Sequence, residues 1–93
     1  MNGASIMTRV RVPNFEAWKP MFDQDEPGVR AAATGWQIYR AAEDGNEIFI
    51  RVDFRSAEEA AAARDKLLAS GVLERFPDHT GPTVVQPAET ITR

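Results

Sequence analysis

The chain has 93 residues, of which 43% are hydrophobic and 27% are charged, and this balance is typical of one folded domain. Its net charge is −3, so the overall basic excess of a general nucleic-acid binder is missing. No cysteine is present, which excludes disulfides, thiolate zinc sites and cysteine nucleophiles.

The first element predicted is a strand over residues 5–12. Side chains of two kinds alternate along it, which is the period-two pattern of a strand with two unlike faces. One row consists of Ile6, Thr8, Val10 and Val12, and the other of Met7, Arg9 and Arg11.

A helix is predicted next, with Asn14 as its N-cap. Three aromatic residues recur along it at helical spacing: Phe15, Trp18 and Phe22. Pro20 removes a backbone hydrogen bond and crowds the preceding turn, so we expect a kinked helix or two short pieces. Pro27-Gly28 then interrupts the chain, and residues 29–33 predict one further turn.

Two strands joined by a tight turn follow. Residues 36–42 alternate, and residues 47–54 form the clearest strand of the sequence. Residues 43–46 supply the Asp-Gly-Asn chemistry of a hairpin turn. The two strands place one row of side chains on the same face: Trp36, Ile38, Arg40, Ile48, Ile50, Val52 and Phe54.

The last third of the chain predicts a helix and a strand. Ser56 and Glu59 form a capping box before an alanine-rich helix over residues 57–69. Residues 72–76 predict a short turn, and residues 77–82 predict a loop that holds the single histidine, His79. Residues 83–92 predict a final strand, which Pro87 confines to a sheet edge or a bulge.

This order, β-α-β-β-α-β, predicts an α+β fold of ferredoxin-like type, with a four-stranded antiparallel sheet and two helices on one face. The more apolar row of each strand is expected to face the helices. The opposite face then carries a mixture too apolar for solvent and too charged for a core: Met7, Arg9, Arg11, Gln37, Tyr39, Phe49, Arg51 and Asp53. We therefore expect a second copy of the chain to cover this face, sheet against sheet, in a homodimer.

Four stretches carry a family resemblance: residues 14–23, 35–40, 46–54 and 56–60. Together they resemble the dimeric α+β-barrel superfamily, and most closely its small antibiotic-biosynthesis-monooxygenase-like and cyclase-like proteins. The resemblance covers most of residues 6–70. It implies a ligand pocket between the helices and the sheet.

Activities in the superfamily include cofactor-free oxidation of polyketide quinones, polyketide cyclisation, muconolactone isomerisation and haem degradation. Haem-degrading relatives use an Asn, a Trp and a His together, but the positions of Asn14, Trp36 and His79 do not match that set, so those roles are not transferred.

Five residues are candidates for a functional site. His79 and Tyr39 are the candidates for proton transfer, the first because histidine often serves as a general acid or base and the second as a donor to a quinone-like oxygen. The alternative roles are a solvated loop residue for His79 and a packing residue at the dimer interface for Tyr39. Trp18, Phe22 and Trp36 are candidates for the walls of an aromatic pocket, although aromatic residues at such spacing more often belong to the core.

These observations predict a small enzyme without metal or organic cofactor, a monooxygenase or cyclase acting on an aromatic or polyketide-like compound. A non-catalytic binding or accessory dimer and a haem-binding protein are the alternatives. The expected partners are a second copy and a small hydrophobic ligand, with no nucleic acid and no membrane. No apolar run approaches the roughly 20 residues that span a bilayer, and residues 1–7 lack a signal-peptide pattern, so a cytoplasmic location is expected.

Overall fold

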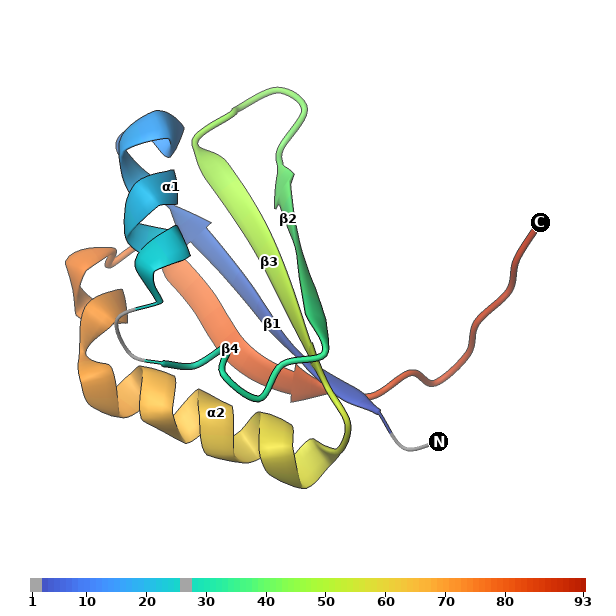
Figure 1. Cartoon of the computed structure of the whole chain (residues 1–93). Helices are drawn as coiled ribbons and strands as arrows, with labels where there is room; N and C mark the ends of the chain where they lie inside the picture. Colours follow the sequence, from blue (N-terminus) through green and yellow to red (C-terminus); the bar gives the residue numbers. More distant parts are fainter. Residues whose placement is uncertain (1–2, 26–27) are drawn as a thin grey trace.

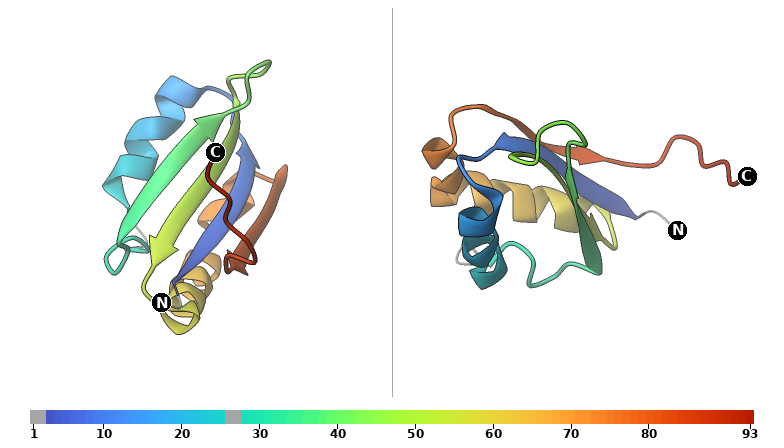
Figure 2. Two further views of the ribbon diagram at one scale, coloured as in Figure 1. Left: turned by 90° about the vertical axis from the view of Figure 1, so that its right-hand side faces the viewer. Right: turned by 90° about the horizontal axis from the view of Figure 1, so that it is seen from above.

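The computed structural model describes residues 3–25 and 28–93, and its elements follow the predicted order (Figure 1). They are β1 (Ala4–Arg11), α1 (Phe15–Gln24), β2 (Gly35–Arg40), β3 (Glu47–Phe54), α2 (Ala57–Ser70), the 3-10 helix η1 (Val72–Arg75) and β4 (His79–Val85). All strand pairs are antiparallel, and the sheet order is β2-β3-β1-β4. Both helices lie on one face of this sheet (Figure 2). The predicted ferredoxin-like α+β fold is confirmed.

The register of the strands confirms the predicted division into two faces. β1 pairs with β3 from Ala4 opposite Phe54 to Arg11 opposite Glu47. Residues opposite each other in an antiparallel pair point to the same side. The helix side therefore carries the buried row that includes Ile6 and its partner, whereas the open side carries exposed apolar residues: Met7, Tyr39 and Phe49.

Helix α1 runs unbroken through Pro20, so of the two expected outcomes, a kinked helix or two short pieces, the second is wrong. Its start is fixed by two side chains. Asn14 accepts a hydrogen bond from the amide of Ala17 at 2.9 Å, and Asn46 accepts one from the amide of Phe15 at 3.1 Å. These bonds satisfy two amides that have no partner within the helix. Pro20 lies on the exposed side of the helix, where water can bind the carbonyl that proline leaves free.

Helix α2 and the turn after it confirm their predictions. The hydroxyl of Ser56 accepts a hydrogen bond from the amide of Glu59 at 3.1 Å, which is the N-cap half of the predicted capping box. The reciprocal bond, from the Ser56 amide to the Glu59 carboxylate, is not formed between these two described residues. Ala60 and Ala63 are the buried residues of the helix, so its small side chains allow close packing on the sheet. Gly71, with a positive φ of 73°, ends the helix and leads into η1. The chain between α1 and β2 also forms the expected turn, at residues 29–32, while Pro27 lies outside the described residues.

Strand β4 differs from its prediction. It begins at His79 and ends at Val85, so His79 lies in a strand and not in a loop, and Pro87 lies beyond the strand. Met7 pairs with Thr83 and Arg9 with Thr80, which leaves Gly81 and Pro82 opposite Thr8 in a β-bulge. The strand is nevertheless at the sheet edge, where a residue without an N–H is tolerated. Residues 86–93 run away from the sheet (Figures 1 and 2).

Glycine is required at position 81. Its φ is 88°, and a Cβ atom there would lie 2.6 Å from the carbonyl oxygen of Met7 on the neighbouring strand. Both the backbone conformation and the close approach of the two strands exclude a larger residue without a shift of the backbone.

Candidate functional site

The core on the helix side of the sheet is divided into two clusters. One lies beneath α2 and includes Ile6, Val52 and Phe54. The other lies beneath α1 and is built around Val10, Trp18, Ile48 and Val12. Thr8 stands between Ile6 and Val10 in the same row of β1 and places a hydroxyl in this otherwise apolar row. The two clusters are therefore separated at the position where the apolar row is interrupted.

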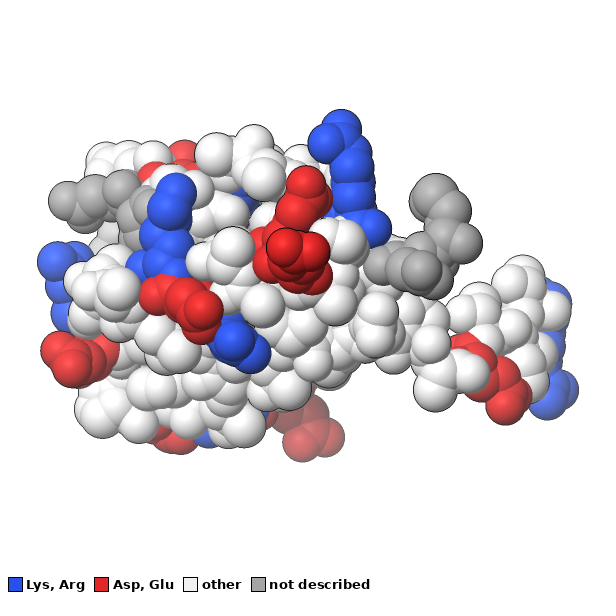
Figure 3. Space-filling view, turned by 90° about the horizontal axis from the view of Figure 1, so that it is seen from below, with Lys and Arg blue, Asp and Glu red and all other residues white. Residues whose placement is uncertain are grey.

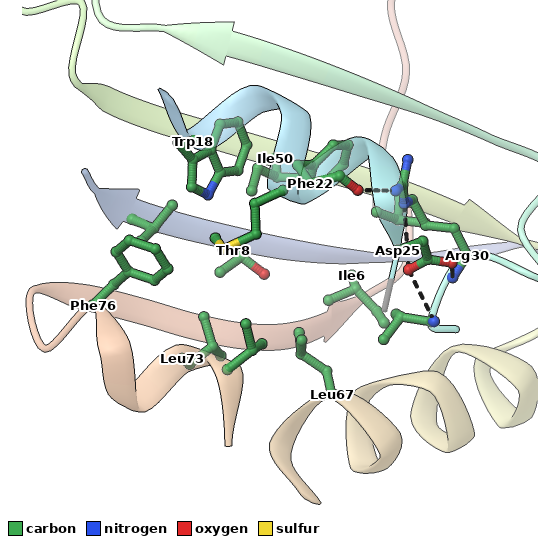
Figure 4. A pocket seen from close by; sticks show the side chains of 15 residues that line it. Ile6, Thr8, Trp18, Phe22, Asp25, Arg30, Ile50, Leu67, Leu73 and Phe76 are labelled. Atoms are coloured by element: carbon green, nitrogen blue, oxygen red, sulfur yellow. Dashed lines mark hydrogen bonds and ion pairs between the residues drawn. The ribbon is translucent and has the colours of Figure 1, made fainter. Parts of the chain in front are cut away.

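A cavity of about 110 Å³ lies between the two helices and the sheet (Figure 4). Thr8 and Ile50 form its floor, Trp18 and Phe22 of α1 form one wall, and the opposite wall includes Leu67 of α2. Among the described lining residues, all but three are apolar, and the polar three are Thr8, Asp25 and Arg30. The cavity is thus a nearly apolar space with polar groups on its floor and at one end.

The volume of this cavity limits what it can hold. Pockets for drug-sized ligands measure roughly 300–1,000 Å³, whereas an engineered apolar cavity of about 150 Å³ binds benzene. The space is therefore suited to a single aromatic ring, and haem or a polycyclic quinone would extend beyond it.

The polar end of the cavity is an ion pair between Asp25 and Arg30. The carboxylate accepts hydrogen bonds from the amides of Val29 at 3.1 Å and of Arg30 at 3.0 Å. The Nε atom of Arg30 lies 3.6 Å from Oδ1 of Asp25, and only 8% of the arginine side chain is exposed. The guanidinium donates to the carbonyl of Phe22 and contacts two rings, with 3.9 Å to the centroid of Phe22 and 4.6 Å to that of Trp36. Such contacts hold the buried cation in one place.

Local backbone structure explains this arrangement. Asp25 follows the last turn of α1 with a positive φ of 47°, and its amide donates to the carbonyl of Phe22 at 3.1 Å. Aspartate tolerates this left-handed conformation better than most residues. The same residue therefore ends the helix with its backbone and begins the next turn with its carboxylate.

Of the three predicted wall residues, the structure brings two to the cavity. Trp18 and Phe22 line it, and their ring centroids are 5.1 Å apart. Trp36 lies on edge strand β2, is 49% exposed, and does not line the cavity. It reaches the site only indirectly, through its contact with the Arg30 guanidinium.

The two candidates for proton transfer lie on opposite faces of the sheet. Tyr39 pairs with Phe49 on the open face. His79 pairs with Val10 on the helix side, and its Nδ1 atom lies 2.6 Å from the carbonyl oxygen of Phe76. Neither residue lines the cavity, so a single chain does not bring the two together there.

The open face has a shallow hollow of its own, about 200 Å³ in volume, near Tyr39. Two arginines border it, and each has an acidic partner. Arg9 is 2.7 Å from Asp78, and its hydrogen bond holds the pKa of that carboxyl below its usual range. Arg51 is 3.0 Å from Asp53. Charges of both signs thus accompany the apolar residues of this face.

Other kinds of site find little support in the part of the chain that the structure describes. No three acidic or histidine side chains gather there as metal ligands. None of the helices is long and apolar enough to cross a membrane. Seen from below, acidic and basic side chains are interspersed and do not form one large patch of a single sign (Figure 3).

Solved structures similar to this chain include the following two. Rv0793 from Mycobacterium tuberculosis superimposes with a TM-score of 0.64 at 19% sequence identity, covering 98% of this chain and 100% of that one. A candidate antibiotic biosynthesis monooxygenase from Chloroflexus aurantiacus J-10-fl gives a TM-score of 0.58 at 11% identity, covering 98% of both chains. No protein-family model and no curated protein matches the sequence. The resemblance noted in the sequence is thus confirmed at the level of the fold.

Proposed function

We propose that the chain binds a small, flat, hydrophobic molecule in the cavity between the helices and the sheet, and that it acts on this molecule as a cofactor-independent enzyme of the monooxygenase or cyclase kind. The observation that carries the proposal is the nearly apolar, ring-sized cavity between Thr8 and Trp18. The similarity in fold to a candidate antibiotic biosynthesis monooxygenase supports the class of reaction.

In such a reaction the protein has two main roles, which are to orient the substrate and to exclude water. A reactive aromatic substrate is held in one orientation and shielded from water, and both effects lower the barrier without a cofactor. Trp18 and Phe22 supply the flat walls, and the hydroxyl of Thr8 is the polar group nearest the middle of the sheet floor. Since the cavity is smaller than haem, haem degradation is not part of the proposal.

Nitrobenzene is a suitable probe, because it is flat, uncharged, of one ring, and quenches tryptophan fluorescence. In Trp36→Phe the only remaining tryptophan is Trp18, which lines the cavity. We expect nitrobenzene to quench this variant along a saturable curve. In Trp18→Phe the remaining Trp36 lies outside the cavity, and quenching should rise almost linearly with concentration.

A linear curve in Trp36→Phe at millimolar nitrobenzene would refute binding in the cavity. Circular dichroism of both variants serves as the control for folding.

The second part of the proposal is a homodimer formed through the open face of the sheet. This face exposes Met7, Tyr39 and Phe49, the last at 39% of its surface. The ion pairs of Arg9 and Arg51 give it both signs of charge, so an identical face laid against it meets no large repulsion. A contact of this kind would also complete the hollow near Tyr39 with residues of the second copy.

Light scattering at micromolar concentration is expected to give about twice the chain mass of 10.3 kDa. Phe49→Asp should halve the measured mass, because it removes an apolar ring from the contact and places there a carboxylate that must lose its water. Leu68→Asp is the matched control: Leu68 is 53% exposed on α2, away from the open face, and its replacement should leave the dimer intact. A folded monomer in the unaltered protein, or equal effects of the two variants, would contradict the dimer.

A further inference from the structure

Arg30 is a buried cation at the end of an apolar cavity. Its side chain is 92% removed from solvent, yet it lines the same space as Phe22 and Ile50. Charged side chains are seldom buried to this degree unless they are paired or bind something. The contacts of the guanidinium therefore indicate which chemical group of a ligand the cavity can bind.

The carboxylate of Asp25 is better satisfied than the guanidinium beside it. Both of its oxygens accept backbone hydrogen bonds, at 3.1 Å from Val29 and 3.0 Å from Arg30. The Nε–Oδ1 separation in the ion pair is 3.6 Å, longer than a hydrogen bond. Among the described residues, the guanidinium makes one hydrogen bond, to the carbonyl of Phe22, although it has five N–H donors.

The two aromatic rings that contact Arg30 cover the flat face of its guanidinium and do not cover the N–H groups at its edge. The rings of Phe22 and Trp36 lie over the guanidinium carbon, at 3.9 Å and 4.6 Å. Rings so placed cover the face of the planar group, and its N–H bonds point outward from the rim. A carboxylate has two acceptor oxygens in one plane, so it can accept two parallel N–H bonds from this rim. A single hydroxyl can accept only one of them, and a cation would be repelled.

We propose that the ligand of the cavity is a one-ring aromatic carboxylate, and that the Arg30 guanidinium binds its carboxylate group. The inference rests on the proposed function and adds the charge and the size of the ligand. The ring would lie on the apolar floor between α1 and α2, with its acidic group at the end of the cavity where Asp25 and Arg30 meet (Figure 4). An amine ligand is disfavoured, because the carboxylate of Asp25 already accepts two amides and faces a cation.

Benzoate and benzamide test the charge, because they have nearly the same shape and differ in ionisation at pH 7. Each is titrated into the nitrobenzene complex of the Trp36→Phe protein, and displacement is followed by recovery of Trp18 fluorescence. Since a charge-assisted hydrogen bond contributes about 1.5–3 kcal/mol, benzoate is expected to bind about 10- to 100-fold more tightly than benzamide. Equal affinities for the two compounds would overturn the inference, and this comparison requires no change at Arg30.

Variants then assign the selectivity to one residue. Arg30→Met should abolish the preference for benzoate and leave the affinity for benzamide nearly unchanged, while Arg30→Lys should retain part of the preference.

Arg40→Met is the matched control, because Arg40 also stacks on a ring, at 4.1 Å from the Phe15 centroid, but does not line the cavity. It removes the same charge from the protein and should leave the preference intact. Loss of preference in Arg40→Met to the same extent as in Arg30→Met would assign the effect to overall charge and overturn the role of Arg30.

The two proposals fail in different ways. If nitrobenzene does not bind, the cavity is not a ligand site, and the proposed function fails. If nitrobenzene binds saturably but benzoate displaces it no better than benzamide, the cavity binds ligands and only the role of Arg30 is wrong.

Discussion

Phe54→Ala is expected to lower the free energy of unfolding by about 3–5 kcal/mol. Phe54 ends the buried row of β3, is 3% exposed, and packs in the cluster beneath α2. Its neighbours there include small residues, Ala4 and Ala60, which cannot move far enough to fill the space that the ring leaves. Urea denaturation, followed by circular dichroism, measures the change as a shift of the midpoint at constant slope.

The control for this substitution is Leu68→Ala on the outer surface of α2. Leu68 is largely exposed, so its truncation should change the free energy of unfolding by no more than about 0.5 kcal/mol. A loss below about 1 kcal/mol for Phe54→Ala would mean that the cluster beneath α2 is loosely packed and can collapse around a missing ring.

Thr8→Ile is expected to remove ligand binding without loss of stability. The larger side chain extends from the floor into the space that the two core clusters leave open. A ligand in the filled site would force neighbouring side chains out of their preferred positions, and this strain costs about 1–3 kcal/mol. The affinity for nitrobenzene should therefore fall about 10- to 100-fold. Cavity filling commonly stabilises a protein, and the free energy of unfolding should stay the same or rise.

Thr8→Val is the matched control, because it removes the hydroxyl but keeps the shape of the side chain. Binding of nitrobenzene should survive this change, since valine keeps the volume of the floor and the lining of the cavity is mostly apolar. If Thr8→Ile binds as tightly as the unaltered protein, the ligand lies elsewhere, and the hollow on the open face near Tyr39 becomes the next place to look.

Most of the fold could be predicted because local signals agree with the tertiary arrangement. The alternation of β1 and β3 identifies both the strands and their buried faces, and the Ser56 capping box marks the start of α2. Strand β4 was misplaced because Gly81 and Pro82 are typical of loops. Only the pairing with β1 shows that they form a bulge within a strand at the sheet edge.

The site was predictable in part, for reasons that differ between its residues. The aromatic spacing of α1 indicated that Trp18 and Phe22 share one face of the helix, and both line the cavity, because periodicity determines which face of a helix is buried. Arg30 had no such signal, since it lies in a turn, and its burial depends on where α1 ends and β2 begins. Thr8 had a weak signal, a polar side chain in an otherwise apolar row, which could have indicated a polar group on the floor of the core.

The bulge in β4 also bears on how the protein avoids forming fibres. A regular edge strand offers a row of free N–H and C=O groups on which another chain can add a strand. Here the edge is interrupted in its middle by Gly81 and by Pro82, which has no N–H. Open-ended growth from strand to strand is thus disfavoured at the β4 edge of the sheet, whereas a contact through the open face closes on itself after two copies.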